Sequence, residues 1–128
     1  MTKILVAADA DWVRDLVRSA FVGPGQKVVD VTRGQDVRDA VAREEPDLVI
    51  LDLQIGNMGG IAVAMDLRLE ESGGRLPHQK MLLLLDREAD RFLAKRADAD
   101  GDVVKPVDAG ILRRVAQPLL ETPSAISK

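Results

Sequence analysis

The chain has 128 residues, a length that suits a single domain with its own hydrophobic core. Its net charge of -3 and isoelectric point near 5.1 lack the basic character of nucleic-acid-binding domains, so no direct binding to DNA or RNA is expected. It has no cysteine, which excludes disulfides and thiol chemistry, and its first apolar run is too short to span a membrane, so we expect a cytoplasmic protein without a membrane anchor.

Short apolar runs alternate with amphipathic segments along the whole chain. The apolar runs predict buried strands over residues 3–8, 26–31, 46–53, 81–85 and 101–104. The amphipathic segments predict helices over residues 12–21, 32–45, 60–71 and 87–97, and a last helix from 108 onward. We expect one domain over residues 1–121 and a flexible tail over 122–128, where Thr, Pro and Ser are frequent.

Several residues carry local predictions about these helices. Thr32 opens a Thr-x-x-Gln pattern typical of a capping box, and Asp108 is placed to cap the last helix. Pro118 lies within that helix and is expected to kink or end it. Trp12 and Phe92 fall on the apolar sides of their helices and are predicted to lie in the core, although a partner-facing Trp12 is the alternative.

Five strands alternating with five helices predict an α/β fold, a doubly wound five-stranded parallel sheet with the flavodoxin-like strand order 2-1-3-4-5. The run Leu48 to Leu51 is continuously apolar, as expected for a strand covered by helices on both faces. In such sheets, ligands bind beyond the carboxyl ends of the strands, next to the point where the strand order reverses. Asp9 and Asp52 end the first and third strands, and Lys105 ends the fifth, so all three are expected at this edge.

These three side chains suggest a chemistry. Two close carboxylates repel one another unless a cation lies between them, and Mg²⁺ prefers oxygen ligands. Asp9, Asp52 and a main-chain carbonyl could hold such an ion, and Asp52 could then attack a phosphoryl group while Lys105 stabilises the developing charge. The plainer alternative is that Asp52 only caps the turn that follows its strand.

The same residues resemble the receiver domain of two-component response regulators, the CheY-like superfamily. The resemblance rests on the acid-ending strand Lys3–Asp9, the strand Pro46–Asp52, the turn Met58-Gly59-Gly60 and the pair Lys105-Pro106. It extends from residue 3 to about residue 120. Individually these motifs are weak, whereas their order and spacing together are specific.

The resemblance implies a role for each matching residue. Asp52 would be the phosphoacceptor, Asp9 a direct Mg²⁺ ligand, Gln54 a ligand through its main-chain carbonyl, and Lys105 the phosphoryl contact. It also implies a cis peptide bond before Pro106. The implied partners are a histidine kinase or phosphotransfer protein and a downstream protein target. The resemblance is also compatible with a homodimer. No enzymatic activity is implied beyond self-phosphorylation and self-dephosphorylation.

Three positions depart from the family pattern. Ala8 stands where receivers commonly have an acid that supports the metal, so weak Mg²⁺ binding is expected. Asp86 stands where receivers have Ser or Thr; it would repel an incoming phosphoryl dianion, unless it serves as the N-cap of the following helix. Asp102 stands where an aromatic residue usually switches position, and the chain has no tyrosine.

Two functions therefore remain open at the level of sequence. The first is a single-domain response regulator that accepts a phosphoryl group on Asp52 and signals through protein contacts. The second is a pseudo-receiver that binds proteins independently of phosphorylation, as the residues at Ala8, Asp86 and Asp102 suggest. A flavodoxin-like flavin carrier is disfavoured, because the chain lacks a phosphate-binding loop and is poor in aromatic residues.

Overall fold

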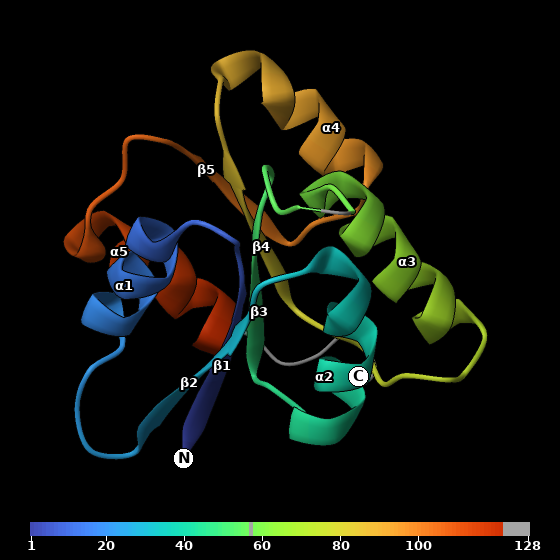
Figure 1. Cartoon of the computed structure of the whole chain (residues 1–128), viewed down its shortest axis with the longest axis horizontal. Coiled ribbons are helices and arrows are strands. Elements are labelled where there is room, and N and C mark those ends of the chain that lie inside the picture. The colour runs from blue at the N-terminus through green and yellow to red at the C-terminus, as the bar shows by residue number, and fades with distance from the viewer. Residues whose placement is uncertain (57, 122–128) are drawn as a thin grey trace.

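A single parallel sheet runs through the molecule and is covered by helices on both faces (Figure 1). The computed structural model describes residues 1–56 and 58–121. The strands are β1 (Thr2–Ala7), β2 (Gln26–Val31), β3 (Leu48–Asp52), β4 (Met81–Leu85) and β5 (Gly101–Val104). They pair in parallel in the order β2-β1-β3-β4-β5, which confirms the predicted fold class and strand order.

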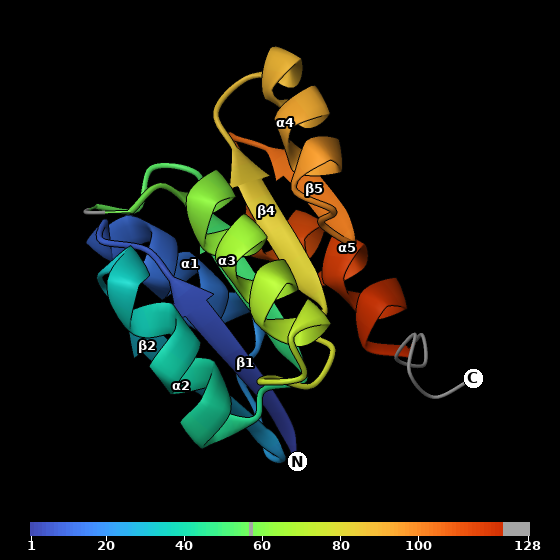
Figure 2. The same cartoon turned by 90° about the vertical axis from the view of Figure 1, so that its right-hand side faces the viewer.

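The helices divide between the two faces of the sheet. They are α1 (Asp11–Ala20), α2 (Val37–Glu44), α3 (Gly60–Ser72), α4 (Arg91–Arg96) and α5 (Ala109–Glu121). Helices α1 and α5 cover one face, and α2, α3 and α4 cover the other, which faces the viewer in Figure 2. Two short 3₁₀ turns, Gly34–Asp36 and Glu88–Asp90, directly precede α2 and α4.

The core consists of two apolar layers, one on each side of the sheet. Every residue of β3 is buried, and successive side chains alternate between the layers: Val49 and Leu51 pack toward α2 and α3, and Leu48 and Ile50 toward α1 and α5. Burying an aliphatic side chain of this size contributes about 1.5–3 kcal/mol. The continuous apolar run of this strand is thus explained by helices on both of its faces.

Local predictions about the helix ends were partly wrong. The segment expected to begin α2 with a capping box at Thr32 instead forms a 3₁₀ turn preceded by Arg33, and among the described residues Arg33 makes no side-chain capping bond. Helix α5 continues past Pro118 to Glu121, so the proline does not end it. The predicted cap of α5 is confirmed, because the Ile111 N–H donates to Asp108 Oδ1 at 2.8 Å.

Two aromatic residues predicted to be in the core are exposed. Trp12 is 54% and Phe92 58% accessible to solvent. The buried positions of α1 are occupied by Val13, Val17 and Ala20, and that of α4 by Ala94, so both aromatic rings lie on other sides of their helices. The expected tail at 122–128 lies outside the described residues, and within the described part no helix is long and apolar enough to cross a membrane.

Glu70 on α3 gives the fold a pH-dependent contribution. Arg75 Nε donates to its Oε2 at 2.6 Å, and Arg38 donates to its Oε1 at 3.2 Å. The Arg75 hydrogen bond is the main reason why the pKa of Glu70 is lowered; burial opposes this, and Arg38 adds to it. A carboxylate whose pKa is lowered by folding stabilises the folded state at pH values above its pKa in the unfolded chain. This contribution is lost as the pH falls through the pKa that the group has in the folded protein.

We therefore expect Glu70→Gln to destabilise the protein at neutral pH, with a penalty that shrinks as the pH falls below about 4.3, the ordinary glutamate value. Urea unfolding between pH 3 and pH 7 measures this difference. Asp39→Asn removes an exposed carboxylate on α2 and serves as the control. A Glu70→Gln penalty that stays constant over this pH range would refute the assignment.

Candidate functional site

The register of the sheet brings the predicted site residues to one edge. The pairing of β1 with β3 extends to Ala7 and Leu51, so Asp9 and Asp52 follow at the carboxyl ends of neighbouring strands. The pairing of β4 with β5 ends at Leu85 and Val104, which places Lys105 just beyond the same edge. This edge lies where the strand order reverses, as predicted.

Lys105 lies between two carboxylates. Its Nζ is 2.6 Å from Asp52 Oδ1 and 3.1 Å from Asp86 Oδ1. Burial by itself lowers the pKa of Lys105, but hydrogen bonds and charges from Asp52 and Asp86 outweigh it, so the pKa lies above its ordinary value. The side chain of Asp52 is only 2% exposed. The site therefore contains a charged ammonium in direct contact with a buried carboxylate.

Asp86 is held from a second direction by Gln54. The Gln54 Nε2 donates to Asp86 Oδ2 at 2.6 Å, and the Gln54 backbone N–H donates to Asp52 Oδ1 at 3.2 Å. The bond from Gln54 lowers the pKa of Asp86, burial opposes this, and Lys105 lowers it further, to a net value below the ordinary one. The N-cap interpretation of Asp86 was wrong, because Arg87 precedes the 3₁₀ turn and its N–H donates to Asp90.

Asp9 is exposed and lies against the loop that follows β3. A Cβ added to Gly56 would be 2.7 Å from Asp9 Oδ2, so this loop passes directly beside the Asp9 carboxylate. Ala8 is fully buried in the layer beneath α1 and α5. The carboxyl end of β1 therefore presents one carboxylate to this loop.

The donor chemistry of Asp9, Asp52 and this loop fits a hard divalent cation, which takes carboxylate and carbonyl oxygens and retains several waters. Within residues 1–56 and 58–121, no three acidic or histidine side chains are grouped closely enough to hold a metal by themselves. The Gln54 carbonyl stays a predicted main-chain ligand beside the two carboxylates.

Comparison with known proteins agrees with this arrangement. The model of the family described as response regulator receiver domain matches residues 4–117. The chain belongs to this family. Receiver domains are generally non-enzymatic signalling modules of two-component response regulators and generally bind Mg²⁺ at the phosphorylation site.

Two curated relatives of this receiver domain are longer proteins whose names describe transcriptional regulators. It is 31% identical over 130 residues to the probable transcriptional regulator ycf27 of Cyanophora paradoxa, covering 95% of this chain and 53% of that protein. It is also 31% identical over 113 residues to the KDP operon transcriptional regulatory protein KdpE of Escherichia coli K12, covering 88% and 48%. The chain thus spans about half the length of these relatives.

Among solved structures, the BeF3-activated N-terminal receiver domain of RstA from Klebsiella pneumoniae superposes with a TM-score of 0.80 at 26% identity. The match covers 94% of this chain and all of the RstA domain. The five-stranded arrangement described above is therefore the receiver fold.

Trp12 is a residue of this receiver domain whose place near the site was not predicted. The Lys105 Nζ lies 5.6 Å from the centroid of its ring, within the range of a cation–π contact. Trp12 follows Asp9 by three residues at the start of α1, and this spacing was the available sequence clue. Lys105 therefore contacts two carboxylates and the face of an indole.

Asp102 and Pro106 mark the strand that carries Lys105. The Asp102 carboxylate forms an ion pair with Arg91 of α4, which ties β5 to that helix at the position where the family usually has an aromatic ring. The Lys105-Pro106 peptide bond is cis, as predicted. Asp102 thus contacts α4 through a charge pair.

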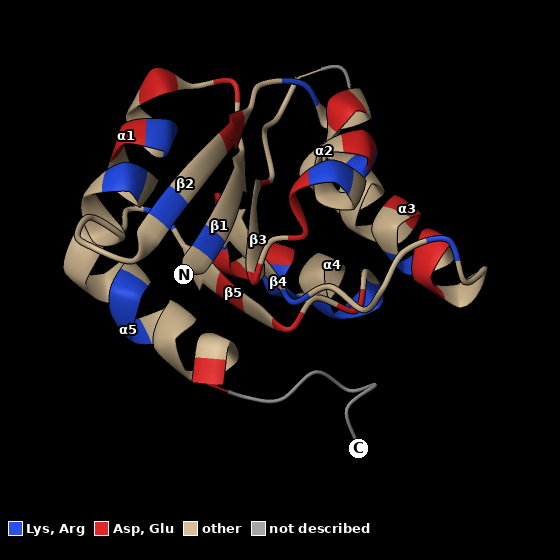
Figure 3. Cartoon of the chain, turned by 90° about the horizontal axis from the view of Figure 1, so that it is seen from below, with Lys and Arg blue, Asp and Glu red and all other residues tan. Residues whose placement is uncertain are grey.

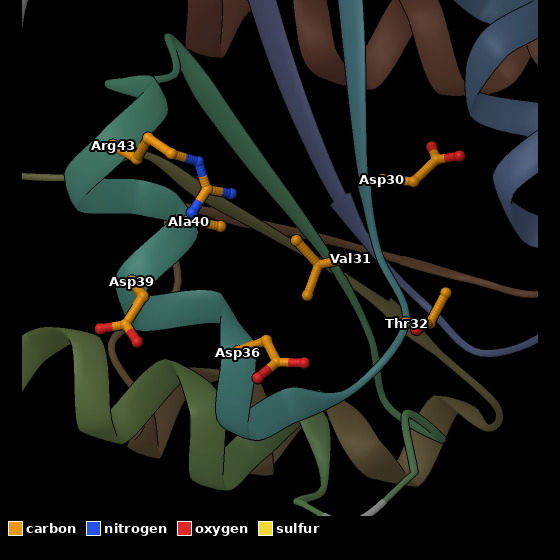
Figure 4. A pocket seen from close by; sticks show the side chains of 7 residues that line it. All are labelled: Asp30, Val31, Thr32, Asp36, Asp39, Ala40 and Arg43. Carbon is orange, nitrogen blue, oxygen red and sulfur yellow. The ribbon is translucent and has the colours of Figure 1, made fainter.

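A separate hollow of about 360 Å³ lies between β2 and α2 and is lined by several acidic residues (Figure 4). The Asp30 carboxylate points away from Asp36 and Asp39, on the other side of β2, and it pairs with Arg18. These carboxylates therefore do not converge on a common point. Figure 3 shows Lys and Arg interspersed with Asp and Glu over the visible helices and not gathered on one basic face.

Proposed function

We propose that this receiver domain accepts a phosphoryl group on Asp52 and signals through contacts with other proteins. The donor would be a phosphohistidine on a histidine kinase or phosphotransfer protein. The observation that carries the proposal is the 2.6 Å contact between Lys105 Nζ and the buried Asp52 Oδ1, at the edge of the sheet where Asp9 also lies. A carboxylate beside a fixed ammonium is suited to attack a phosphorus atom whose oxygens carry negative charge.

In this reaction an Asp52 carboxylate oxygen forms a bond to phosphorus. The P–N bond of the donor breaks, and its electron pair stays on the imidazole nitrogen. The product is a mixed anhydride between Asp52 and phosphate. In this proposal Lys105 contacts the transferred oxygens, which its 2.6 Å contact with Asp52 supports, and the Gln54 N–H orients the Asp52 carboxylate. A bound Mg²⁺ would supply charge neutralisation for the phosphoryl oxygens, with Asp9, Asp52 and the Gln54 carbonyl as its proposed holders.

The proposal predicts that a small-molecule phosphodonor with Mg²⁺ adds the mass of one phosphoryl group to the wild-type chain. Asp52→Asn should abolish this increase, because the Asp52 carboxylate is the nucleophile. Removal of divalent ions by a chelator should abolish it too, because the carboxylates of the site would then repel the phosphoryl oxygens without a metal ion to neutralise them. Asp39→Asn, at an exposed carboxylate of α2, should react like the wild type. A phosphoryl group that still appears on Asp52→Asn would contradict the proposal, as would a wild-type chain that never gains one.

A second candidate function is a protein-binding module that works without phosphorylation. It is favoured by the contact of Asp86 with Lys105, since a carboxylate already engages this ammonium. This candidate predicts that Asp52→Asn leaves the affinity for a downstream partner protein unchanged. A clear loss of affinity in a binding titration would exclude it.

A further inference from the structure

The ammonium of Lys105 has a second anionic partner that phosphoryl transfer does not require. Its contact with Asp86 Oδ1 is 3.1 Å and its contact with Asp52 Oδ1 is 2.6 Å, so both carboxylates lie within hydrogen-bond distance. The other oxygen of Asp86 accepts the 2.6 Å hydrogen bond from Gln54 Nε2. Both oxygens of Asp86 are therefore held, and the carboxylate points toward Lys105.

The contacts of Asp86 limit what this carboxylate can do. Both of its oxygens have hydrogen-bond partners, and the described residues contain no group of three acidic or histidine side chains suited to a metal, so Asp86 is not a third carboxylate ligand of an ion at Asp9 and Asp52. It does not cap the following turn either, because Arg87 precedes that turn. Its remaining role concerns Lys105.

A phosphoryl group on Asp52 would have to approach the same ammonium. Any group bonded to an Asp52 oxygen comes within reach of a nitrogen that is 2.6 Å from that carboxylate. An ammonium has three N–H donors in total, and one of them is directed at Asp86. A phosphoryl dianion would also meet the negative charge of Asp86 at short range.

We propose that Asp86, held in place by Gln54, is an internal anion that competes with the phosphoryl group for Lys105 and so limits phosphoryl uptake by Asp52. This inference rests on the proposed function of Asp52 and deepens it. Asp86 acts through Lys105 and is therefore a positioning residue. Gln54 has two roles in this arrangement, because its backbone N–H orients Asp52 while its side chain orients Asp86.

The test compares variants that change charge and shape separately. Asp86→Asn removes the charge with little change in shape, Asp86→Thr provides a neutral hydroxyl donor, and Asp86→Glu keeps the carboxylate. We expect Asp86→Asn and Asp86→Thr to raise the rate of Asp52 phosphorylation by acetyl phosphate and Mg²⁺ about tenfold or more, whereas Asp86→Glu stays near the wild-type rate. Gln54→Ala should give a smaller increase, because Asp86 keeps its charge and loses only its orientation.

A second measurement avoids the chemical step. Trifluoroberyllate imitates a phosphoryl group on a carboxylate, and its binding is followed by fluorine NMR. Asp86→Asn should bind it about tenfold more tightly than the wild type, in parallel with the rates. Asp39→Asn removes one exposed charge on α2 and should change neither quantity. Thermal unfolding of each variant verifies that it is folded.

The outcomes separate this inference from the proposed function. Equal rates and affinities in the wild type and Asp86→Asn, with phosphorylation on Asp52 in both, would overturn the inference alone. Phosphorylation of Asp86→Asn but not of the wild type would support the inference and contradict the proposed function of the native chain. Neither phosphorylation nor trifluoroberyllate binding in any chain would overturn both.

Discussion

Replacing Lys105 by methionine is expected to slow Asp52 phosphorylation by about 10²–10³-fold, because a positioned charge of this kind usually contributes that much to a transition state. The same change should destabilise the fold by about 2–4 kcal/mol. This is slightly less than the destabilisation that follows when one partner of a fully buried ion pair is removed. Asp52 is 2% and Lys105 15% exposed, so the carboxylate loses its closest counter-charge away from water. Urea unfolding and the phosphorylation rate measure the two effects.

The double variant Lys105→Met with Asp86→Asn distinguishes a loss of charge from a loss of packing. Removing Asp86 also removes the repulsion between two carboxylates left without their shared cation, so part of the stability should return. Lys27→Met, at an exposed position of β2, controls for the substitution itself. A Lys105→Met chain as stable and as reactive as the wild type would mean that the contacts of this ammonium have no energetic role.

The second large effect is expected at Gly60, the first residue of α3. A Cβ there would lie 2.5 Å from the Asp52 carbonyl oxygen and 3.0 Å from Leu53 Cα, and both are backbone atoms that cannot rotate away. We expect Gly60→Ala to cost about 1–3 kcal/mol, as overpacking in a core does. Because the strand end that carries Asp52 must shift to make room, phosphorylation should slow as well. Chemical unfolding and the rate of Asp52 phosphorylation provide the measurements.

Gly59 offers a matched control for this substitution. Its φ of -60° is accessible to any residue, and a Cβ there would lie 3.9 Å from the Leu53 carbonyl oxygen, an ordinary contact. Gly59→Ala should therefore leave stability within about 0.5 kcal/mol of the wild type. Equal effects of the two alanines would show that the clash at Gly60 is relieved without cost.

The fold could be predicted from the sequence because two patterns agree: the apolar runs and the charged residues that follow them. The apolar runs are buried strands, and acids or a lysine follow them at the edge where parallel strands end, so Asp9, Asp52 and Lys105 could be assigned to one site before the structure was known. The order of the strands was expected because it is the order of flavodoxin-like sheets. These inferences depend on backbone topology, which periodic patterns determine well.

Side-chain partners were harder to predict. Gln54 and Asp86 are 32 residues apart, and their hydrogen bond depends on the exact positions of two loops, so Asp86 was taken for a helix cap. Trp12 and Phe92 were assigned to the core because periodicity marks an apolar side of a helix but not the space beneath it. The side of each helix that meets the sheet depends on packing across elements, and there other residues, Val13 and Val17 on α1 and Ala94 on α4, are buried.

The position of Trp12 makes the site observable by light. Trp12 is the single tryptophan of a chain without tyrosine, so the near-ultraviolet emission of the protein comes almost wholly from this indole. Because the Lys105 ammonium lies 5.6 Å from the ring, any event that draws this charge away from the ring or toward it alters the electric field in which the indole emits. The native protein thus carries its own optical reporter of Lys105, with no label to attach.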